Sequence, residues 1–291
     1  MSDIVQLVAS GCATGAVYAL AAMGFVLLWQ TSGTINFAQG EFVMLPAFAM
    51  LAGLRAGLPL PIAFVVTLLA AGLVLGAGFK RAVVDPIVRS GVLPLVVATL
   101  GLSLAVKNAV RVGYSAEAQP FPQVLPGGTW SLLGVHISIA DLGTLVIAGA
   151  LLAGLHWFIT RTLFGRSMQA CAQNPDAAHV LGVDVRRMIL ATFVINALLA
   201  TCVALLVTPV WFAKFDMGDG VGLKAFFAAI IGGFNQMRGA LLGGLLLGLL
   251  ENLAAAYVSP AYKDAVALML FVVVILFRPE GLLGRAQERT V

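Results

Sequence analysis

The chain has 291 residues, of which 60% are hydrophobic and 10% charged, and its mean hydropathy is +1.01. Soluble proteins carry about 25% charged residues, so this composition excludes a water-soluble enzyme, a disordered chain and a secreted disulfide scaffold. The formal net charge of +4 does not indicate nucleic-acid binding, because Lys and Arg are scattered between apolar runs and form no basic patch. The composition therefore predicts a polytopic helical membrane protein.

Apolar runs recur along the whole chain and are candidates for membrane-spanning helices. A bilayer core of about 30 Å is crossed by roughly 20 apolar residues in an α-helix. We therefore expect an all-α polytopic membrane bundle of eight to ten spans, formed by a single transmembrane domain over residues 1–291. The candidate spans are residues 4–29, 36–54, 60–79, 92–110, 139–158, 188–208, 223–237, 239–257 and 264–277.

Three of these runs have features of their own. Residues 4–29 follow an N-terminus without basic residues and are longer than a signal-peptide core, so we expect them to be a retained first span. The run 36–54 contains Pro46 near its middle, and the run 223–237 is interrupted by two consecutive glycines. Broken or re-entrant helices are therefore expected among the spans.

The distribution of Lys and Arg between the spans predicts the orientation of the chain. With the N-terminus outside, the inner segments carry Lys80, Arg81, Arg89, Arg161, Arg166, Arg186, Arg187, Arg238, Arg278, Arg285 and Arg289. The outer segments carry fewer basic residues, namely Arg55, Lys107, Arg111, Lys214, Lys224 and Lys263, with Lys107 and Lys224 at span ends. We therefore expect the N-terminus outside, the C-terminus in the cytoplasm, and the long basic loop 159–187 on the cytoplasmic side.

Two sequence patterns predict how the helices pack. Glycines four residues apart line one helix face and allow close backbone approach, so they predict a compact bundle. Residues 36–40 (Asn-Phe-Ala-Gln-Gly) also resemble residues 235–239 (Asn-Gln-Met-Arg-Gly), a faint internal repeat of the kind found in transporters built from inverted repeats. The glycine pairs are Gly11/Gly15, Gly72/Gly76, Gly239/Gly243 and Gly244/Gly248.

Polar residues within or beside apolar runs are candidates for a substrate path. Glu251 and Asn252 lie deep in a predicted span, where an ionisable group is costly and faces a bundle interior or a watery cavity. Glu251 is therefore either a path residue or a buried polar link between helices. Asn36, Gln39 and Glu41 either belong to the path or its gate, or form a loop at the inner interface in which Glu41 stabilises a helix N-terminus.

The sequence lacks several motifs that catalysis would require. It contains no Gly-x-x-x-x-Gly-Lys-[Ser/Thr] loop, and even the dipeptide Gly-Lys is missing. It also contains no His-Glu-x-x-His, no Gly-x-Ser-x-Gly and no clustered His or Cys. We therefore expect no enzyme, no metal site and no ATPase site in this chain.

The loop 159–187 contains strong signals for a short helix. Asn174 is a favourable N-cap, Pro175 suits the first helical position, and Gly182 can end the helix in a left-handed turn. The predicted helix is about 10 Å long and is suited to dock into a groove of another protein, although it could also be a plain connecting helix. The candidate docking and coupling residues are Arg166, Asn174, Asp176, Ala177, Ala178 and Gly182.

Several segments resemble one known family, the permease subunits of branched-chain amino-acid ABC importers. Residues 33–45 resemble the segment after the first span of that family, in which His is usual at the position of Gln39. Residues 176–182 resemble the cytoplasmic EAA-type loop of ABC importer permeases, with Asp176 in place of Glu and without the downstream Leu-Pro. The other similar segments are 172–178, 232–240 and 277–283.

The resemblance implies a subunit of the bacterial inner membrane that imports branched-chain or other small neutral amino acids. It implies three kinds of partner: a second homologous permease, two cytoplasmic ABC ATPases and a periplasmic substrate-binding protein. It implies no cofactor in this chain, since ATP and Mg²⁺ would be bound by the ATPases. The small number of deep charges agrees with a net-neutral, zwitterionic substrate.

Other functions are alternatives at this point. Within the same family, the substrate could be urea or a short amide. An ion-coupled secondary transporter would use Glu41 or Glu251 as a proton or Na⁺ site and would work without ATP. A passive channel would have a uniform pore lining and would not need the long inner loop. An intramembrane enzyme would need a nucleophile with a base, or paired carboxylates.

Overall fold

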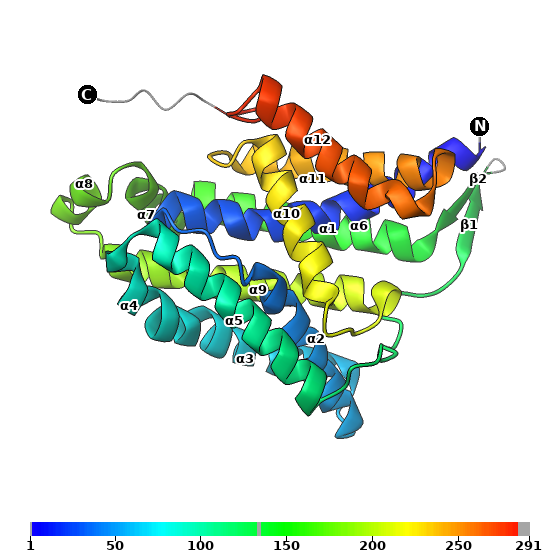
Figure 1. The fold of residues 1–291 in the computed structure, drawn as a ribbon, viewed down its shortest axis with the longest axis horizontal. Coiled ribbons are helices and arrows are strands. Elements are labelled where there is room, and N and C mark those ends of the chain that lie inside the picture. The colour runs from blue at the N-terminus through cyan, green and yellow to red at the C-terminus, as the bar shows by residue number, and fades with distance from the viewer. Residues whose placement is uncertain (1, 133–134, 285–291) are drawn as a thin grey trace. The chain divides into compact units, whose positions relative to one another are not determined.

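The structure, a computed structural model, describes residues 2–132 and 135–284 and consists mainly of helices (Figure 1). The first half contains α1 (Ser2–Ser32), α2 (Gln39–Arg55), α3 (Leu60–Ala71), the π-helical η1 (Gly72–Gly78) and η2 (Lys80–Val84), α4 (Asp85–Ile87), the 3-10 helix η3 (Val88–Ser90) and α5 (Val92–Gly113). The second half contains strands β1 (Thr129–Leu132) and β2 (Val135–Ser138), then α6 (Ile139–Arg161), α7 (Leu163–Gln173), α8 (Pro175–Val180), α9 (Val185–Trp211), α10 (Met217–Gly232), α11 (Met237–Tyr257), the 3-10 helix η4 (Pro260–Tyr262) and α12 (Lys263–Phe277). Arg285 and Arg289, which contributed to the predicted orientation, lie outside the described residues.

The expected polytopic helical fold is confirmed. Among the described residues, 7 helical segments are long and apolar enough to cross a membrane, and α3 to η3 form one of them, Leu60–Ser90. The expectation of eight to ten spans also included α2 and α10, which have only 17 and 16 residues. Both are shorter than the roughly 20 residues that cross a bilayer core, and the difference in the number of spans comes from these two helices.

The chain folds into two compact units. Unit 1 consists of the described parts of Met1–Val26, Leu125–Ala153 and Lys224–Val291, and unit 2 consists of Leu27–Val124 and Gly154–Leu223. Three helices, α1, α6 and α10, continue from one unit into the other.

In unit 1, helices α1 and α11 approach each other at glycines. A Cβ atom on Gly244 would lie 2.5 Å from the backbone N of Ala19, and one on Gly248 would lie 2.3 Å from the N of Gly15. Only residues without a side chain allow two helix backbones to pack this closely. The sequence pattern of glycines four residues apart therefore corresponds to an α1–α11 contact, and α12 packs on α11.

The segment after α12 binds the end of α10. The backbone N–H of Leu282 donates to the carbonyl of Ile231 at 2.8 Å, and that of Leu283 donates to the carbonyl of Gly232 at 3.1 Å. The last carbonyls of a helix lack partners within the helix, and this segment supplies them. Two of the segments that carry the family resemblance are thereby in contact.

In unit 2, helix α9 packs against α2, α3 and η1. The ring of Phe79 lies 5.1 Å from the ring of Phe42 and 6.1 Å from that of Phe193, between centroids. Gly76 allows η1 to approach α9, because a Cβ atom there would lie 2.7 Å from the Cα of Val194. Apolar and aromatic packing therefore holds α2 and η1 on α9.

Two local features differ from the sequence expectation. Helix α10 begins at Met217 and not near residue 223, so Asp219 lies in its first turn. The segment between α5 and α6, for which the sequence predicts no span, contains the antiparallel β1–β2 hairpin, in which Trp130 pairs with Ile137.

The glycine contact between α1 and α11 gives a test of the fold. A Gly248→Leu substitution would force a side chain into the backbone of α1, and overpacking of this kind costs about 1–3 kcal/mol. We expect a lower melting temperature in detergent, measured by size-exclusion chromatography after heating. The matched control is Gly149→Leu in α6, where a Cβ atom would meet nothing within 4 Å. Equal destabilisation by both substitutions would contradict this packing.

Candidate functional site

Asn36 shapes the turn that leads into α2. The side chain is 2% exposed, and its Oδ1 accepts a hydrogen bond from the N–H of Ala38 at 3.0 Å. Its Nδ2 has no hydrogen-bond partner among the described residues. A buried amide donor without a partner is unfavourable, so this atom is a donor that a ligand could use.

Gln39 is joined to a residue that sequence reasoning missed. Its Nε2 donates to Oδ1 of Asn196 at 2.8 Å, and Nδ2 of Asn196 donates to Oε1 of Gln39 at 2.8 Å. Both side chains are buried, at 1% and 0% exposure. This reciprocal amide pair links the start of α2 to the middle of α9.

Glu41 is buried in the first turn of α2, at 3% exposure. Its Oε1 accepts a hydrogen bond from the Ser103 hydroxyl of α5 at 2.8 Å, whereas its Oε2 has no hydrogen-bond partner among the described residues. The helix N-terminus favours the negative charge, which was one of the two roles considered for Glu41. Burial of a carboxylate with an unused acceptor is nevertheless costly.

Helix α10 begins where α2 begins. A Cβ atom on Gly40 would lie 2.3 Å from the carbonyl O of Gly218, and one on Gly218 would lie 2.5 Å from the carbonyl O of Gly40. The contact is reciprocal, so the two helix N-termini cross through their backbones. Each glycine is followed by an acidic residue in the first turn, Glu41 in α2 and Asp219 in α10.

The crossing joins two similar sequences. Phe-Ala-Gln-Gly-Glu at 37–41 and Phe-Asp-Met-Gly-Asp at 215–219 share the pattern Phe-x-x-Gly-acid. This similarity is distinct from the one between residues 36–40 and 235–239, and the acid directly after the glycine is its signal in the sequence. Paired interrupted helices of this kind mark the substrate region of many transporters.

Lys107 of α5 completes the charged group at the crossing. It forms an ion pair with Asp219 and also interacts electrostatically with Glu41. Ser103 and Lys107 are one helical turn apart on the same face of α5. Lys107, expected at the end of a span, lies in the last two turns of α5, and its side chain is only 20% exposed.

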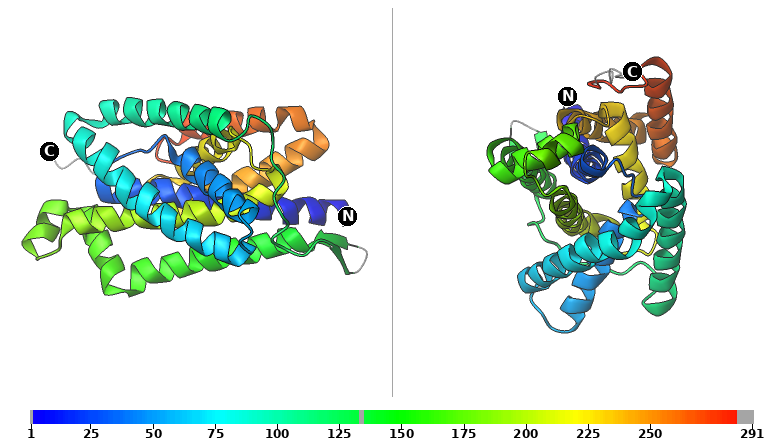
Figure 2. Two further views of the ribbon diagram at one scale, coloured as in Figure 1. Left: turned by 90° about the horizontal axis from the view of Figure 1, so that it is seen from below. Right: turned by 90° about the vertical axis from the view of Figure 1, so that its left-hand side faces the viewer.

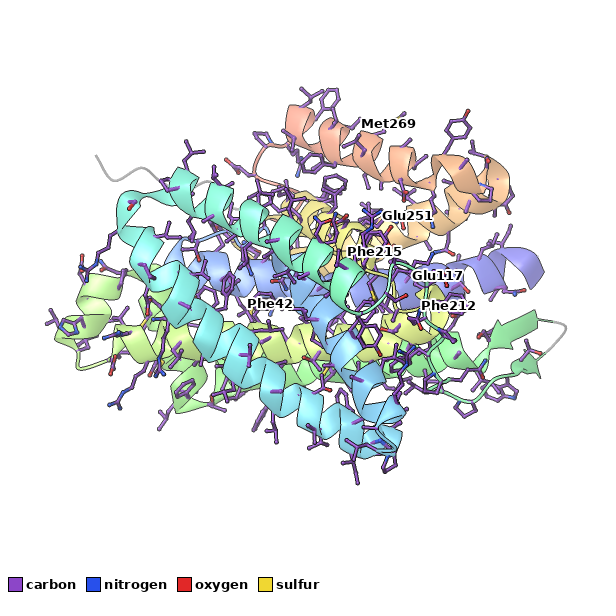
Figure 3. All side chains as sticks on the ribbon, turned by 60° about the horizontal axis from the view of Figure 1, so that its bottom comes forward. Phe42, Glu117, Phe212, Phe215, Glu251 and Met269 are labelled. Carbon is purple, nitrogen blue, oxygen red and sulfur yellow. The ribbon has the colours of Figure 1, made fainter. Side chains whose placement is uncertain are left out.

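The segment between α9 and α10 is held by Gln119. The N–H of Gln119 donates to the carbonyl of Ala213 at 2.9 Å, and the N–H of Ala213 donates to the carbonyl of Gln119 at 3.0 Å. Arg55, at the end of α2, donates to the Gln119 side chain. Phe212, labelled in Figure 3, has a φ of +61°, a strained conformation for a residue other than glycine. These bonds fix the backbone from which α10 starts.

Glu251 belongs to a polar cluster in unit 1 (Figure 3). It is 4% exposed, its Oε1 lies 2.8 Å from Nζ of Lys224, and its Oε2 accepts a hydrogen bond from the Tyr18 hydroxyl at 2.8 Å. Lys224 also contacts Asp264 at 2.9 Å and lies 5.5 Å from the centroid of the Tyr18 ring. The cluster ties together α1, α10, α11 and α12.

This geometry is that of a buried polar link between helices, one of the two roles considered for Glu251. Asn252 makes a similar link, because its Nδ2 donates to the carbonyl of Gly248 at 3.0 Å and to the hydroxyl of Thr14 at 3.4 Å. Lys224 was taken for an outer charge at a span end but lies inside α10, at 7% exposure. A deep acid in a membrane helix commonly pairs with a base at similar depth, and that tendency could have identified Lys224 as its partner.

The loop 159–187 has the predicted helix caps. Oδ1 of Asn174 accepts a hydrogen bond from the N–H of Ala177 at 3.0 Å, Pro175 is the first residue of α8, and Gly182 has a φ of +85° just beyond its end. Helices α7 and α8 lie at one end of α9 (Figure 2). Local sequence alone thus determined the shape of this segment.

One face of α8 is exposed and the other face is buried. Asp176 and Ala177 are exposed, and the end of the helix presents Val180 at 86% and Leu181 at 80% exposure. Ala178 is 2% exposed and packs with the buried residues of the neighbouring helices. It therefore supports the helix and does not contribute to the exposed surface on which it was expected to act.

The junction of α6 and α7 positions Arg166. The hydroxyl of Thr162 accepts a hydrogen bond from the N–H of Gly165 at 3.0 Å and caps α7. Arg166 is exposed, and its Nε donates to the carbonyl of Thr160 at 3.4 Å. Arg166 therefore lies on the same loop as α8 with its positive charge facing solvent.

Comparison with known proteins gives the family. The model of the family "Branched-chain amino acid transport system / permease component" matches residues 7–275. The chain is 33% identical to the high-affinity branched-chain amino acid transport system permease protein BraD of Pseudomonas aeruginosa, over 98% of this chain and 97% of BraD. It is 30% identical to the corresponding permease protein LivH of Escherichia coli, with coverage of 98% and 97%.

The chain belongs to this family of branched-chain amino-acid permeases. The permease is also 30% identical to the autoinducer 2 import system permease protein LsrC of Enterobacter sp., over 95% of this chain and 79% of LsrC. Its fold is similar to that of PsaBC from Streptococcus pneumoniae, solved in complex with a Fab, with a TM-score of 0.51 and 12% identity over 93% of this chain and 91% of that chain.

The ion pair of Glu251 gives a test of its role as a link. A Lys224→Met substitution would leave the Glu251 carboxylate buried without its counter-charge, a loss that costs about 3–5 kcal/mol. We expect a marked drop in melting temperature, and partial recovery in the double variant Lys224→Met/Glu251→Gln. The matched control is Lys263→Met on α12, which should change the melting temperature little. A double variant less stable than Lys224→Met would contradict the link.

Proposed function

We propose that this permease is the transmembrane subunit of an ATP-driven ABC importer that moves branched-chain or other small neutral amino acids into the cytoplasm. The observation that carries the proposal is the similarity to BraD and LivH over nearly the full length of all three chains. The membrane-spanning helices and the capped helix α8 support it.

The proposal includes the partner proteins that this subunit needs for ATP-driven transport. Because the sequence has no P-loop, ATP and Mg²⁺ bind to two cytoplasmic ABC ATPases and not to this subunit. A second homologous permease completes the membrane part, and a periplasmic substrate-binding protein delivers the amino acid. The subunit spans the bacterial inner membrane with its N-terminus outside and its C-terminus in the cytoplasm.

Helix α8 is the proposed contact with an ATPase. Its exposed apolar end, Val180 and Leu181, and its exposed Asp176 and Ala177 form a small surface of the kind that fits a groove. When ATP brings the two ATPases together, their movement displaces α8 and switches the bundle from inward-open to outward-open. The difference in ligand affinity between these states couples ATP hydrolysis to transport.

A second candidate function concerns the substrate alone. The similarity to LsrC, a permease of autoinducer 2 import, supports a permease of the same family that carries another small organic solute, including urea or a short amide. Uptake of radiolabelled leucine, urea and acetamide by the reconstituted complex distinguishes these cases. Uptake driven by an ion gradient without ATP would instead identify a secondary transporter.

The coupling role of α8 can be tested by changing its exposed end. A Leu181→Asp substitution should reduce both the amount of ATPase that co-purifies and the rate of leucine uptake by about tenfold or more, because burying a charge in an apolar groove is unfavourable. The amount of permease in the membrane should not change. The matched control is Leu163→Asp, at a residue of α7 that is 82% exposed. Unchanged uptake in Leu181→Asp would contradict the coupling role.

The proposed orientation can be tested with a thiol reagent that does not cross membranes. In a background with Cys12→Ala and Cys202→Ala, we expect Ala177→Cys to react only after the membrane is opened. Glu117→Cys, on the segment between α5 and β1 (Figure 3), should react in intact spheroplasts. Native Cys171 should remain unlabelled, because burial raises the pKa of its thiol and the thiolate is the reactive form. The reverse labelling pattern would overturn the orientation.

A further inference from the structure

We infer that the permease holds the charged head group of an amino acid where the N-termini of α2 and α10 cross, with Glu41 accepting hydrogen bonds from the α-ammonium group and Lys107 donating to the α-carboxylate. The inference rests on the proposed function and adds to it a site and a ligand chemistry, namely a zwitterion. All the residues concerned lie in unit 2.

One carboxylate oxygen of Glu41 is free to accept a hydrogen bond from a ligand. Glu41 is 97% buried, since only 3% of it is exposed, and Ser103 occupies one of its two carboxylate oxygens. The other oxygen, Oε2, has no hydrogen-bond partner in the described part of the chain. An ammonium group offers three donors and one positive charge. It can therefore supply a hydrogen-bond donor to Oε2 and a counter-charge to the carboxylate.

A second buried polar atom near the same turn also lacks a partner. Nδ2 of Asn36 is a donor without an acceptor among the described residues, and Asn36 is 2% exposed. Buried groups of this kind are rare in folded proteins and call for an explanation. A ligand that carries both acceptors and donors could provide an acceptor for Nδ2 of Asn36 and a donor for Oε2 of Glu41.

Lys107 gives the site its positive end at a suitable spacing. Ser103, which contacts Glu41, and Lys107 are four residues apart on α5, about 6 Å along the helix. The two charges of an α-amino acid are separated by one carbon atom. With a charge-assisted hydrogen bond of about 2.8 Å at each end, the head group can join protein groups up to about 8 Å apart, which covers the offset between Ser103 and Lys107 along α5.

The ion pair of Lys107 with Asp219 links binding to the position of α10. The side chain of Asp219 is 52% exposed and that of Lys107 is 20% exposed, so the pair is weak and water can replace either partner. A substrate carboxylate that takes over Lys107 releases Asp219, and with it the first turn of α10, from α5. Substrate binding thereby allows α10 to move against α2 at the Gly40–Gly218 crossing, where the two helices meet through glycine backbone atoms.

The other buried carboxylate, Glu251, is less suited to this task. In unit 1 its Oε2 accepts a hydrogen bond from Tyr18 at 2.8 Å, and its Oε1, which accepts no hydrogen bond from the described residues, lies 2.8 Å from Nζ of Lys224 in an ion pair. A ligand ammonium would have to break an existing buried ion pair there. Glu41 can accept the ligand without losing a bond that it already makes.

The experiment uses the complete transporter in proteoliposomes and measures ATP-driven uptake of radiolabelled leucine. Glu41→Gln keeps the shape of the side chain and an acceptor for Ser103 but removes the charge. We expect leucine uptake to fall by about tenfold or more, the effect of losing a charge-assisted hydrogen bond in a buried site. Lys107→Gln should lower uptake in the same direction. Glu117→Gln, the same change at an exposed glutamate of unit 2, is the control and should leave uptake unchanged.

The melting temperature of the variants distinguishes a ligand-binding role of Glu41 from a purely structural role. If Glu41 serves the ligand, Glu41→Gln removes an incompletely satisfied buried charge, so the melting temperature should stay the same or rise while uptake falls. If Glu41 only supports the fold, melting temperature and uptake should fall together, which would overturn the inference. Glu41→Asp keeps the charge and should recover part of the uptake.

The outcomes also distinguish this inference from the proposed function. A wild-type complex that imports no amino acid but imports urea or an amide would refute the proposed function. A wild-type complex that imports leucine with ATP, together with a Glu41→Gln variant that imports it equally well, would refute the inference alone. Retained leucine uptake in Lys107→Gln with loss in Glu41→Gln would refute the role of Lys107.

Discussion

The contact between two helix N-termini at Gly40 and Gly218 is the constraint on which the candidate site depends. Either glycine with a Cβ atom would overlap the backbone of the other helix, so the crossing exists only because both positions lack side chains. The contact places the acids that follow, Glu41 and Asp219, beside the same stretch of α5. Helix dipoles favour both negative charges, and Lys107 balances them.

The two buried carboxylates differ in how completely their polar atoms are satisfied. Glu251 has a counter-charge and a hydroxyl donor, and its cluster joins four helices of unit 1. Glu41 has a single hydroxyl donor, and one of its oxygens is unused. In a medium of low dielectric constant, an unsatisfied polar atom is expensive. Completed pairs therefore suit a structural role, whereas an incomplete set suits a site that is completed by a ligand.

The loop 159–187 shows a different relation between sequence and structure. Asn174, Pro175 and Gly182 act on the backbone within a few residues of themselves, so their sequence order is sufficient to define α8. Which face of so short a helix is buried depends on the helices beneath it. Ala177 and Ala178 are chemically identical neighbours, yet one is exposed and the other is buried against residues of α7 and α9.

The sequence by itself determined the membrane class, the helical fold, most span positions, the caps of α8 and the family resemblance, because hydrophobic length, helix capping and motif spacing are local properties. It also identified Glu41 and Glu251 as costly charges in apolar surroundings. Only the tertiary structure decided their partners, Ser103 for one and Lys224 and Tyr18 for the other. It also paired Gln39 with Asn196 and Gly40 with Gly218. Apart from Glu251–Lys224, these contacts join residues more than 60 positions apart in the sequence, and no local rule of spacing specifies which distant helix will supply the missing partner.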